Sequence, residues 1–113
     1  MNKIEIINKI FEDKEIRSVW DSEKGDYYFS VIDIIEVLTN SPRPRKCWNA
    51  LKSRLKLEGS KLSSKLGQLK LKSSKAGKLY LTDVLDTKDI LRLIEFISPT
   101  KAEPFKLWLA SLE

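Results

Sequence analysis

The chain has 113 residues, within the ~100–150 that are most common for one domain, so we expect a single domain over residues 1–113. Hydrophobic residues make up 42% of it and no apolar run approaches the ~18–20 residues of a membrane span, so we expect a folded, soluble, cytoplasmic protein without membrane contact. The net charge is +5, and one cysteine with no histidine excludes an internal disulfide, the usual zinc sites and every histidine-dependent catalytic triad.

The first thirty residues predict two strand pairs. Residues 10–11 and 16–20 predict two strands on either side of a turn at residues 12–14. Ile4, Ile7 and Ile10 also recur at helical spacing, which leaves a helix as the alternative. Residues 21–25 have turn chemistry, so residues 16–20 and 27–29 should form an antiparallel hairpin.

Two helices are predicted next. Ser30 and Asp33 have the spacing of a capping box, and the apolar residues that follow at i, i+3, i+4 and i+7 indicate a buried helix over residues 31–38. The chain then breaks at two prolines. Pro44 suits the first position of a second helix that reaches about Glu58, with Gly59 as its stop.

The remaining residues predict a hairpin between helices. A Ser/Lys/Leu stretch that can hold a short helix precedes two alternating segments, residues 68–72 and 78–82, which are joined by a loop at residues 73–77. Asp86 or Thr87 can cap a further helix that ends at residues 98–99. The fold class is therefore α+β, a single domain in which small antiparallel β-hairpins pack with about four to five α-helices.

Two starts are open for the last helix. Thr100 and Glu103 can form a capping box, or Pro104 can occupy the first helical position. In either case the inward-facing side chains are expected to be Phe105, Leu107, Trp108 and Leu109.

Positive charge is concentrated in the middle of the chain. Residues 41–78 contain twelve Lys or Arg and one acid, Glu58, whereas the rest of the chain contains nine basic and fifteen acidic residues. A concentrated positive region attracts polyanions, most often the phosphates of nucleic acid. The alternative is an ordinary lysine-rich, solvated surface.

The predicted second helix carries the strongest candidate site. One of its faces holds the apolar residues, and a neighbouring stripe holds Arg45, Asn49, Lys52 and Lys56. Arg and Asn make bidentate contacts with guanine and adenine edges, and Lys contacts phosphates. The helix thus has the composition of a major-groove reader; an ordinary amphipathic surface helix has a similar composition.

Further basic residues lie beside this helix. Lys70 and Lys72 should project from the hairpin and Lys75 from its loop, where they suit phosphate contact or protection of an exposed strand edge. The prolines around Arg43 form a stiff basic turn that suits phosphate anchoring or solubility. The nucleic-acid-binding candidates are Arg43, Arg45, Lys46, Asn49, Lys52, Lys56, Lys70, Lys72 and Lys75.

No catalytic residue, metal site or cofactor is expected. Four carboxylates suit helix caps or first-turn charges, namely Asp33, Asp83, Asp86 and Asp89. Cys47 falls on the packing face of its helix, and the four glycines form no phosphate-binding motif. We therefore do not expect an enzyme.

Several blocks of the chain resemble the N-terminal domain of the BRO family, a module found at the start of many phage and prophage antirepressors and related to bacterial DNA-damage-inducible protein D. The most specific block is KAEPFKLWLA at residues 101–110. The others are IRSVW (16–20), YFSVIDII (28–35), CWNALKSRL (47–55), GQLKL (67–71), TDV (82–84) and LRLI (91–94). Where family members have tryptophan ahead of the second block, the chain has Tyr27.

The resemblance implies a small α+β module associated with DNA binding, usually followed in longer proteins by a C-terminal domain. The chain accordingly looks like the N-terminal fragment, or a stand-alone copy, of an antirepressor-type protein, and its end at Leu112 and Glu113 suits a cloning remnant. We expect a phage-related transcription regulator whose basic central region binds duplex DNA. The alternative is a module that binds a repressor or another acidic protein directly; a homodimer would suit a two-fold operator.

Overall fold

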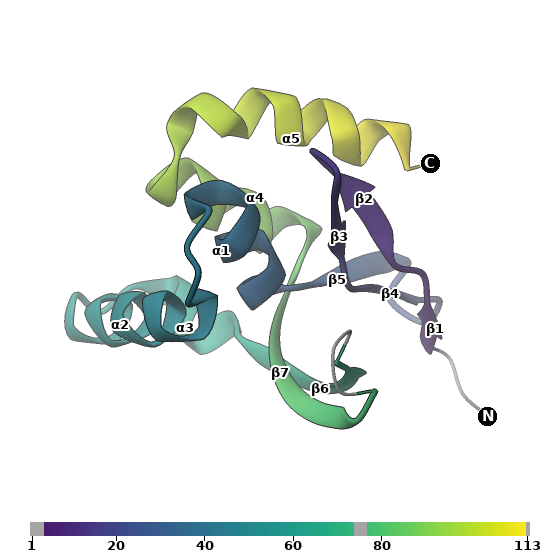
Figure 1. Cartoon of the computed structure of the whole chain (residues 1–113), viewed down its shortest axis with the longest axis horizontal. Coiled ribbons are helices and arrows are strands. Elements are labelled where there is room, and N and C mark those ends of the chain that lie inside the picture. Colours follow the sequence, from purple (N-terminus) through teal and green to yellow (C-terminus); the bar gives the residue numbers. More distant parts are fainter. Residues whose placement is uncertain (1–3, 74–76, 113) are drawn as a thin grey trace.

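The computed structural model describes residues 4–73 and 77–112, with the backbone alone for residues 4–6. In chain order the elements are β1 (Ile4–Ile6), β2 (Lys9–Phe11), β3 (Lys14–Ile16), β4 (Ser18–Asp21), β5 (Asp26–Ser30), α1 (Val31–Thr39), α2 (Pro44–Leu57), α3 (Lys61–Lys65), β6 (Gly67–Lys72), β7 (Leu79–Asp86), α4 (Thr87–Ile97) and α5 (Pro99–Ser111). The predicted α+β fold is confirmed (Figure 1). Within the described ranges no helix is long and apolar enough to cross a membrane.

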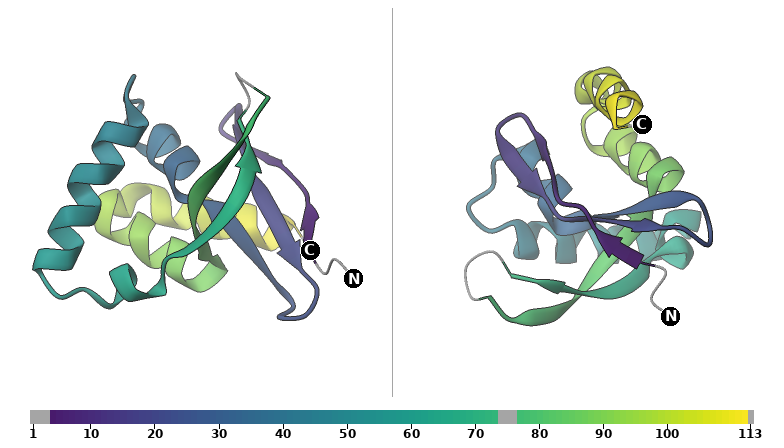
Figure 2. Two further views of the ribbon diagram at one scale, coloured as in Figure 1. Left: turned by 90° about the horizontal axis from the view of Figure 1, so that it is seen from below. Right: turned by 90° about the vertical axis from the view of Figure 1, so that its right-hand side faces the viewer.

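Five strands form one antiparallel sheet in the order β1-β4-β5-β7-β6, and β2 and β3 form a separate hairpin. β7 joins the two halves of the sheet, because its end pairs with β5 at Val84–Asp86 and its earlier part pairs with β6 alone. Strands β6 and β7 therefore leave the body of the sheet as a long twisted pair, the β6–β7 ribbon, with α2 standing to one side of it (Figure 2). The sequence predicted this strand to end at Thr82; it continues to Asp86 because Val84 and Leu85 are buried in the sheet.

Both predicted hairpins of the N-terminal part form, as strands rather than a helix, but the predicted strand at residues 16–20 is divided at Arg17 into β3, which pairs with β2, and β4, which pairs with β5. Glu12 and Asp13 both have positive φ, of 49° and 64°, which is the geometry of the tight turns that best match twisted hairpins. In the next turn the Asp21 carboxylate accepts hydrogen bonds from the backbone N–H groups of Glu23 and Lys24. These turns bring β2–β3 and β4–β5 into register.

Helix α1 begins as predicted at Ser30, whose hydroxyl accepts from the backbone N–H of Asp33. The second half of the predicted capping box does not form. Asp33 instead accepts hydrogen bonds from Arg17, and the backbone N–H of Ser30 donates to the carbonyl of Arg17. α2 begins at Pro44 and ends before Gly59, whose φ of +67° stops the helix, and Asp86 caps α4.

The start of α5 corrects the sequence prediction. The helix begins at Pro99, and Pro104 lies inside it rather than at its first position, so neither predicted start is right. Pro99 has the φ that a first helical residue requires, which places the helix start one turn earlier. Phe105 is fully buried and Trp108 donates to the carbonyl of Ile10, so Leu107 points the other way and is 67% exposed, contrary to the prediction.

Two clusters of buried residues hold the fold together. The larger lies between the sheet and the helices and includes an aromatic group from β2, β5 and α5, formed by Phe11, Phe29, Phe105 and Trp108, whose contacting rings have centroids 5.1–6.2 Å apart. The smaller lies on the opposite face of the sheet and contains Val19, Leu71 and Val84, with Tyr28 and Leu69 against it. One face of the ribbon is thus packed against the sheet. Because side chains alternate along a strand, Gln68, Lys70 and Lys72 lie on the other face.

Candidate nucleic-acid interface

Helix α2 is oriented by its two buried side chains. Trp48 and Leu55 are 3% and 2% exposed and join the main core. Because the charged stripe is displaced around the helix from these residues, Arg45, Asn49 and Lys56 are exposed, whereas Lys52 is half-buried. The first turn of α2 contains no acidic residue, so the positive end of its dipole adds to the charge of this region.

A single carboxylate connects α2 with the ribbon. Oδ2 of Asp83, on β7, accepts hydrogen bonds from the indole N–H of Trp48 and the ammonium group of Lys52, each at 2.8 Å. Its other oxygen accepts from the side-chain amide of Gln68 at 3.1 Å. Asp83 is therefore not the helix cap that the sequence suggested. It fixes the position of α2 relative to β6 and β7.

The environment of Asp83 lowers its pKa. Burial alone would raise the pKa of this carboxyl group, but hydrogen bonds from Lys52, Trp48 and Gln68 and the positive charge of Lys52 favour the charged form and outweigh burial. The carboxylate is thus ionised at neutral pH. Lys52 is in turn committed to an internal ion pair.

A groove runs between α2 and the ribbon. We call it the basic groove; its lining includes Arg45, Asn49 and Lys52 from α2 and Gln68, Leu81 and Asp83 from the ribbon, around a hollow of about 150 Å³. Three cations line the groove, but Lys52 is paired with Asp83 and Arg17 with Asp33, so Arg45 is the lining cation that forms no ion pair among the described residues. The groove therefore presents positive charge together with the amide groups of Asn49 and Gln68.

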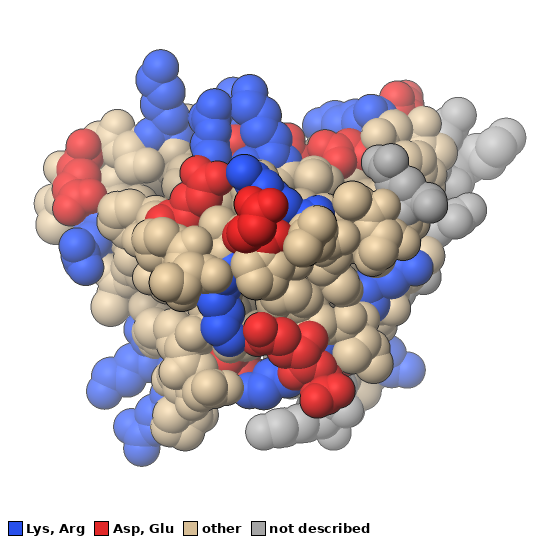
Figure 3. All heavy atoms as spheres, turned by 90° about the horizontal axis from the view of Figure 1, so that it is seen from above, with Lys and Arg blue, Asp and Glu red and all other residues tan. Residues whose placement is uncertain are grey.

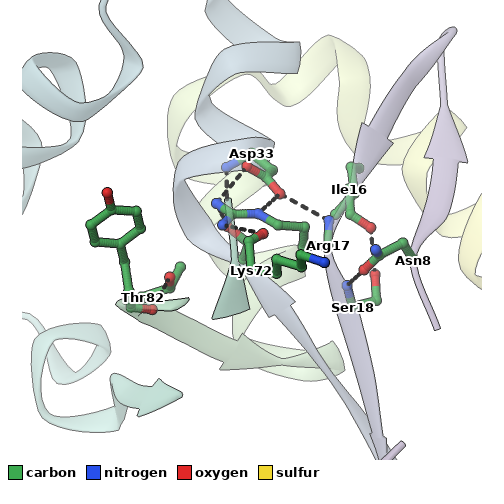
Figure 4. Close-up of polar contacts among 9 residues, drawn as sticks. Asn8, Ile16, Arg17, Ser18, Asp33, Lys72 and Thr82 are labelled. Atoms are coloured by element: carbon green, nitrogen blue, oxygen red, sulfur yellow. Dashed lines mark hydrogen bonds and ion pairs between the residues drawn. The ribbon is translucent and has the colours of Figure 1, made fainter. Parts of the chain in front are cut away.

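A second ion pair lies beside the basic groove, between Arg17, which lines it, and Asp33 on α1. Arg17 donates to Asp33 from Nε at 2.8 Å and from Nη2 at 3.0 Å, and its backbone N–H donates to the same carboxylate at 2.9 Å (Figure 4). The guanidinium group also reaches the hydroxyl of Ser30 and the carbonyl of Lys72 on β6. Both side chains of the pair are only 16% exposed. Arg17 thus joins the junction of β3 and β4, the start of α1 and the end of β6.

The structure brings most of the predicted site residues to one region. Arg45, Asn49 and Lys52 line the basic groove, Arg43 and Lys46 lie at the adjoining start of α2, and Lys56 lies near its other end. Lys70 and Lys72 are exposed on the ribbon, and Lys75 falls outside the described residues. In the described part of the chain, no ion pair is formed by Arg43, Arg45, Lys46, Lys56, Lys70 or Lys72.

Sequence reasoning missed several groove residues. Gln68 and Leu81 were treated as ordinary strand residues, and Arg17 as part of a strand. The predicted hairpin, with strands at residues 68–72 and 78–82 around a loop at 73–77, pairs residue 72 with residue 78. The structure pairs Lys72 with Leu79, and this register sets Gln68 opposite Asp83. The sequence carried no signal for the contact between Asp83 and α2.

The face of the molecule that carries α5 has acidic and basic side chains intermixed (Figure 3), unlike the surfaces of α2 and the ribbon. Seen from above α5, Asp and Glu side chains lie among Lys and Arg side chains (Figure 3). Among the ion pairs of the described residues, the one between Lys101 on α5 and Glu12 lies at this end of the molecule. Mixed signs at close spacing largely cancel, so the unpaired cations of α2 and the ribbon are the better candidate for a polyanion.

Comparison with known proteins identifies a family. The family model described as "BRO family, N-terminal domain" matches residues 15–112. Neither the curated proteins nor the solved structures contain a significant match to the chain. The matched range includes most of β3, every element from β4 to α5 and the whole basic groove, and it includes Leu112, whose carbonyl accepts a hydrogen bond from the hydroxyl of Tyr27.

Proposed function

The chain belongs to the BRO family, through its N-terminal domain, and on that premise we propose that it is a DNA-binding regulatory module of the phage or prophage antirepressor type. The proposed site is the basic groove together with the exposed cations on either side of it. The module binds DNA without catalysing a reaction, and its role is in transcription regulation.

One observation carries this proposal. Two separate cationic surfaces, on α2 and on the β6–β7 ribbon, are held side by side by the three hydrogen bonds of Asp83. Cations that are not paired within the protein are free to replace the counterions of a phosphate backbone, which is the main source of affinity in protein–DNA binding. A rigid arrangement of such cations requires less ordering on binding than a flexible tail would.

The residues divide into contact and positioning roles. Arg43, Arg45, Lys46 and Lys56 on one side, and Lys70 and Lys72 on the other, are placed to contact phosphates. Asn49 is exposed on the same stripe of α2 as Arg45, and its side-chain amide can donate to a phosphate oxygen or to a base edge. Lys52 is a positioning residue, because its ammonium group is bound to Asp83 inside the protein.

The experiment is a fluorescence-anisotropy titration of the domain with a random duplex at several salt concentrations. The test variant is R45E/K56E, and the matched control is K88E/K106E, which makes the same charge change at exposed lysines of α4 and α5. We expect the test variant to lose at least about tenfold in affinity and its salt slope to fall by about 1 for each lost phosphate contact. An equal loss of affinity in both variants, or no loss in either, would show that the basic groove and its flanking cations are not the DNA-binding site.

A second candidate function is direct binding of a protein such as a repressor. An apolar hollow between α1, α2 and α4 favours it, since Phe96 is 47% exposed there beside Leu51 and Ile97. Binding through this hollow would depend weakly on salt and would be sensitive to Phe96→Ser. DNA binding in the same measurements would be unaffected by that substitution.

The module would bind an operator with two-fold symmetry as a dimer. Sedimentation of the complex with such an operator would detect the dimer.

A further inference from the structure

The ribbon presents two exposed leucines on the face that carries its lysines. Leu81 is paired across the strands with Lys70, and Leu79 with Lys72, so these four side chains project to one side. Leu79 is 61% exposed and Leu81 is 59% exposed. Leu81 also lines the basic groove, so this surface is continuous with α2.

The core does not explain these leucines. The opposite face of the ribbon supplies the packed side chains, since Leu71 and Val84 are buried against Val19. The leucines lie ahead of Val84, the first residue of β7 that pairs with β5, so β5 does not flank them. Leaving two adjacent large apolar side chains in water is unfavourable unless a partner covers them.

We infer that the β6–β7 ribbon enters the major groove of duplex DNA, with Leu79 and Leu81 against base edges and α2 along the flanking phosphates. This inference rests on the proposed function and assigns its two elements different tasks. Lys70 and Lys72, beside the leucines, then reach phosphates or the acceptor atoms of guanine.

Charge and shape favour this occupant. A phosphate backbone offers nothing to cover a leucine, whereas the major groove exposes the methyl groups of thymine at its floor. The major groove of B-DNA, about 12 Å wide, admits a two-stranded ribbon without deformation. α2 has cations and Asn49 on its exposed stripe but no exposed apolar residue in the groove, which suits the backbone.

The test uses L79A/L81A, with L107A and L57A as controls, because Leu107 and Leu57 are equally or more exposed but lie on α5 and at the end of α2. Binding is measured by anisotropy against one A·T-rich duplex made with thymine and again with uracil, which lacks the methyl group. We expect L79A/L81A to bind the thymine duplex about tenfold more weakly with an unchanged salt slope, because apolar contacts release no counterions. We also expect the parent domain, but not this variant, to bind the uracil duplex severalfold more weakly than the thymine duplex.

Other outcomes would overturn either the inference about the ribbon or the proposed function. If R45E/K56E loses binding but L79A/L81A binds like the parent, the ribbon does not enter a groove and the proposed function stands. Equal binding of thymine and uracil duplexes by the parent, with loss in L79A/L81A, would show that the leucines do not contact thymine methyl groups and would overturn the inference. Leucine-dependent binding to phosphatidylserine vesicles, with DNA binding intact in the variant, would overturn it in favour of a membrane surface. Absence of any duplex binding by a folded parent domain would overturn the proposed function itself.

Discussion

The ammonium group of Lys52 lies 2.8 Å from the carboxylate of Asp83, and this pair connects helix α2 with strand β7. Trp48 donates to the same carboxylate oxygen from the preceding turn of α2. The relative position of the two cationic surfaces therefore depends on one side chain. Lys52, which the sequence places among the candidate DNA contacts, forms an ion pair within the protein that links its stripe of α2 to β7.

Replacing Asp83 should uncouple the two surfaces. In Asp83→Asn the ammonium of Lys52 loses its charged partner, and we expect the free energy of unfolding to fall by about 1–3 kcal/mol. Urea denaturation measures this change. Asp13→Asn is the control, because Asp13 is exposed in a turn whose positive φ asparagine tolerates, and it should change stability by less than about 0.5 kcal/mol. Equal stability of the two variants would show that the Asp83 contacts contribute little.

The same carboxylate predicts a pH dependence. The pKa of Asp83 is lowered in the folded state from its usual 3.8, so the unfolded chain binds the proton more readily. The stabilisation is therefore complete above the unfolded pKa and is lost as the pH falls through the lower folded pKa. We expect the stability difference between the parent and Asp83→Asn to be constant near neutral pH and to shrink below about pH 4. A difference that grows on acidification would contradict the assigned direction of the shift.

The ion pair between Arg17 and Asp33 should contribute far more to stability than the pair between Lys101 and Glu12. Asp33→Asn leaves the guanidinium of Arg17 without its charged partner in a position only 16% exposed, and we expect a loss of about 3 kcal/mol. Glu12→Gln removes a partner at a solvent-exposed pair and should cost less than about 1 kcal/mol. Thermal denaturation of the two variants compares them directly. Similar melting temperatures would mean that Arg17 does not join β3, α1 and β6 as described.

Local sequence patterns predicted most of the fold. The turn residues around Glu12 and Gly25, the cap at Ser30 and the proline at position 44 each act within a few residues, and the predicted elements formed there. The error at α5 was also local, because both Pro99 and Pro104 can occupy the first position of a helix, and the helix begins at the earlier one.

The sequence predicted which residues belong to the candidate site but not how α2 and the ribbon are arranged in space. Helical periodicity placed Arg45, Asn49 and Lys56 on one stripe, as found, because periodicity depends on the helix alone. It gave no information on Asp83, which is 31 residues from Lys52, since a contact between α2 and the ribbon depends on how the whole chain packs. The continuation of β7 to Asp86 was missed for the same reason.

We propose that DNA contacts both α2 and the β6–β7 ribbon. The most direct test is an NMR titration of the isotope-labelled domain with a short duplex. We predict that amide shift changes concentrate on residues 43–56 and on β6 and β7, and that they disappear progressively as salt is added. Residues of α5 should not respond. Shift changes centred on α5 or on the hollow around Phe96, with α2 and the ribbon unaffected, would contradict the account.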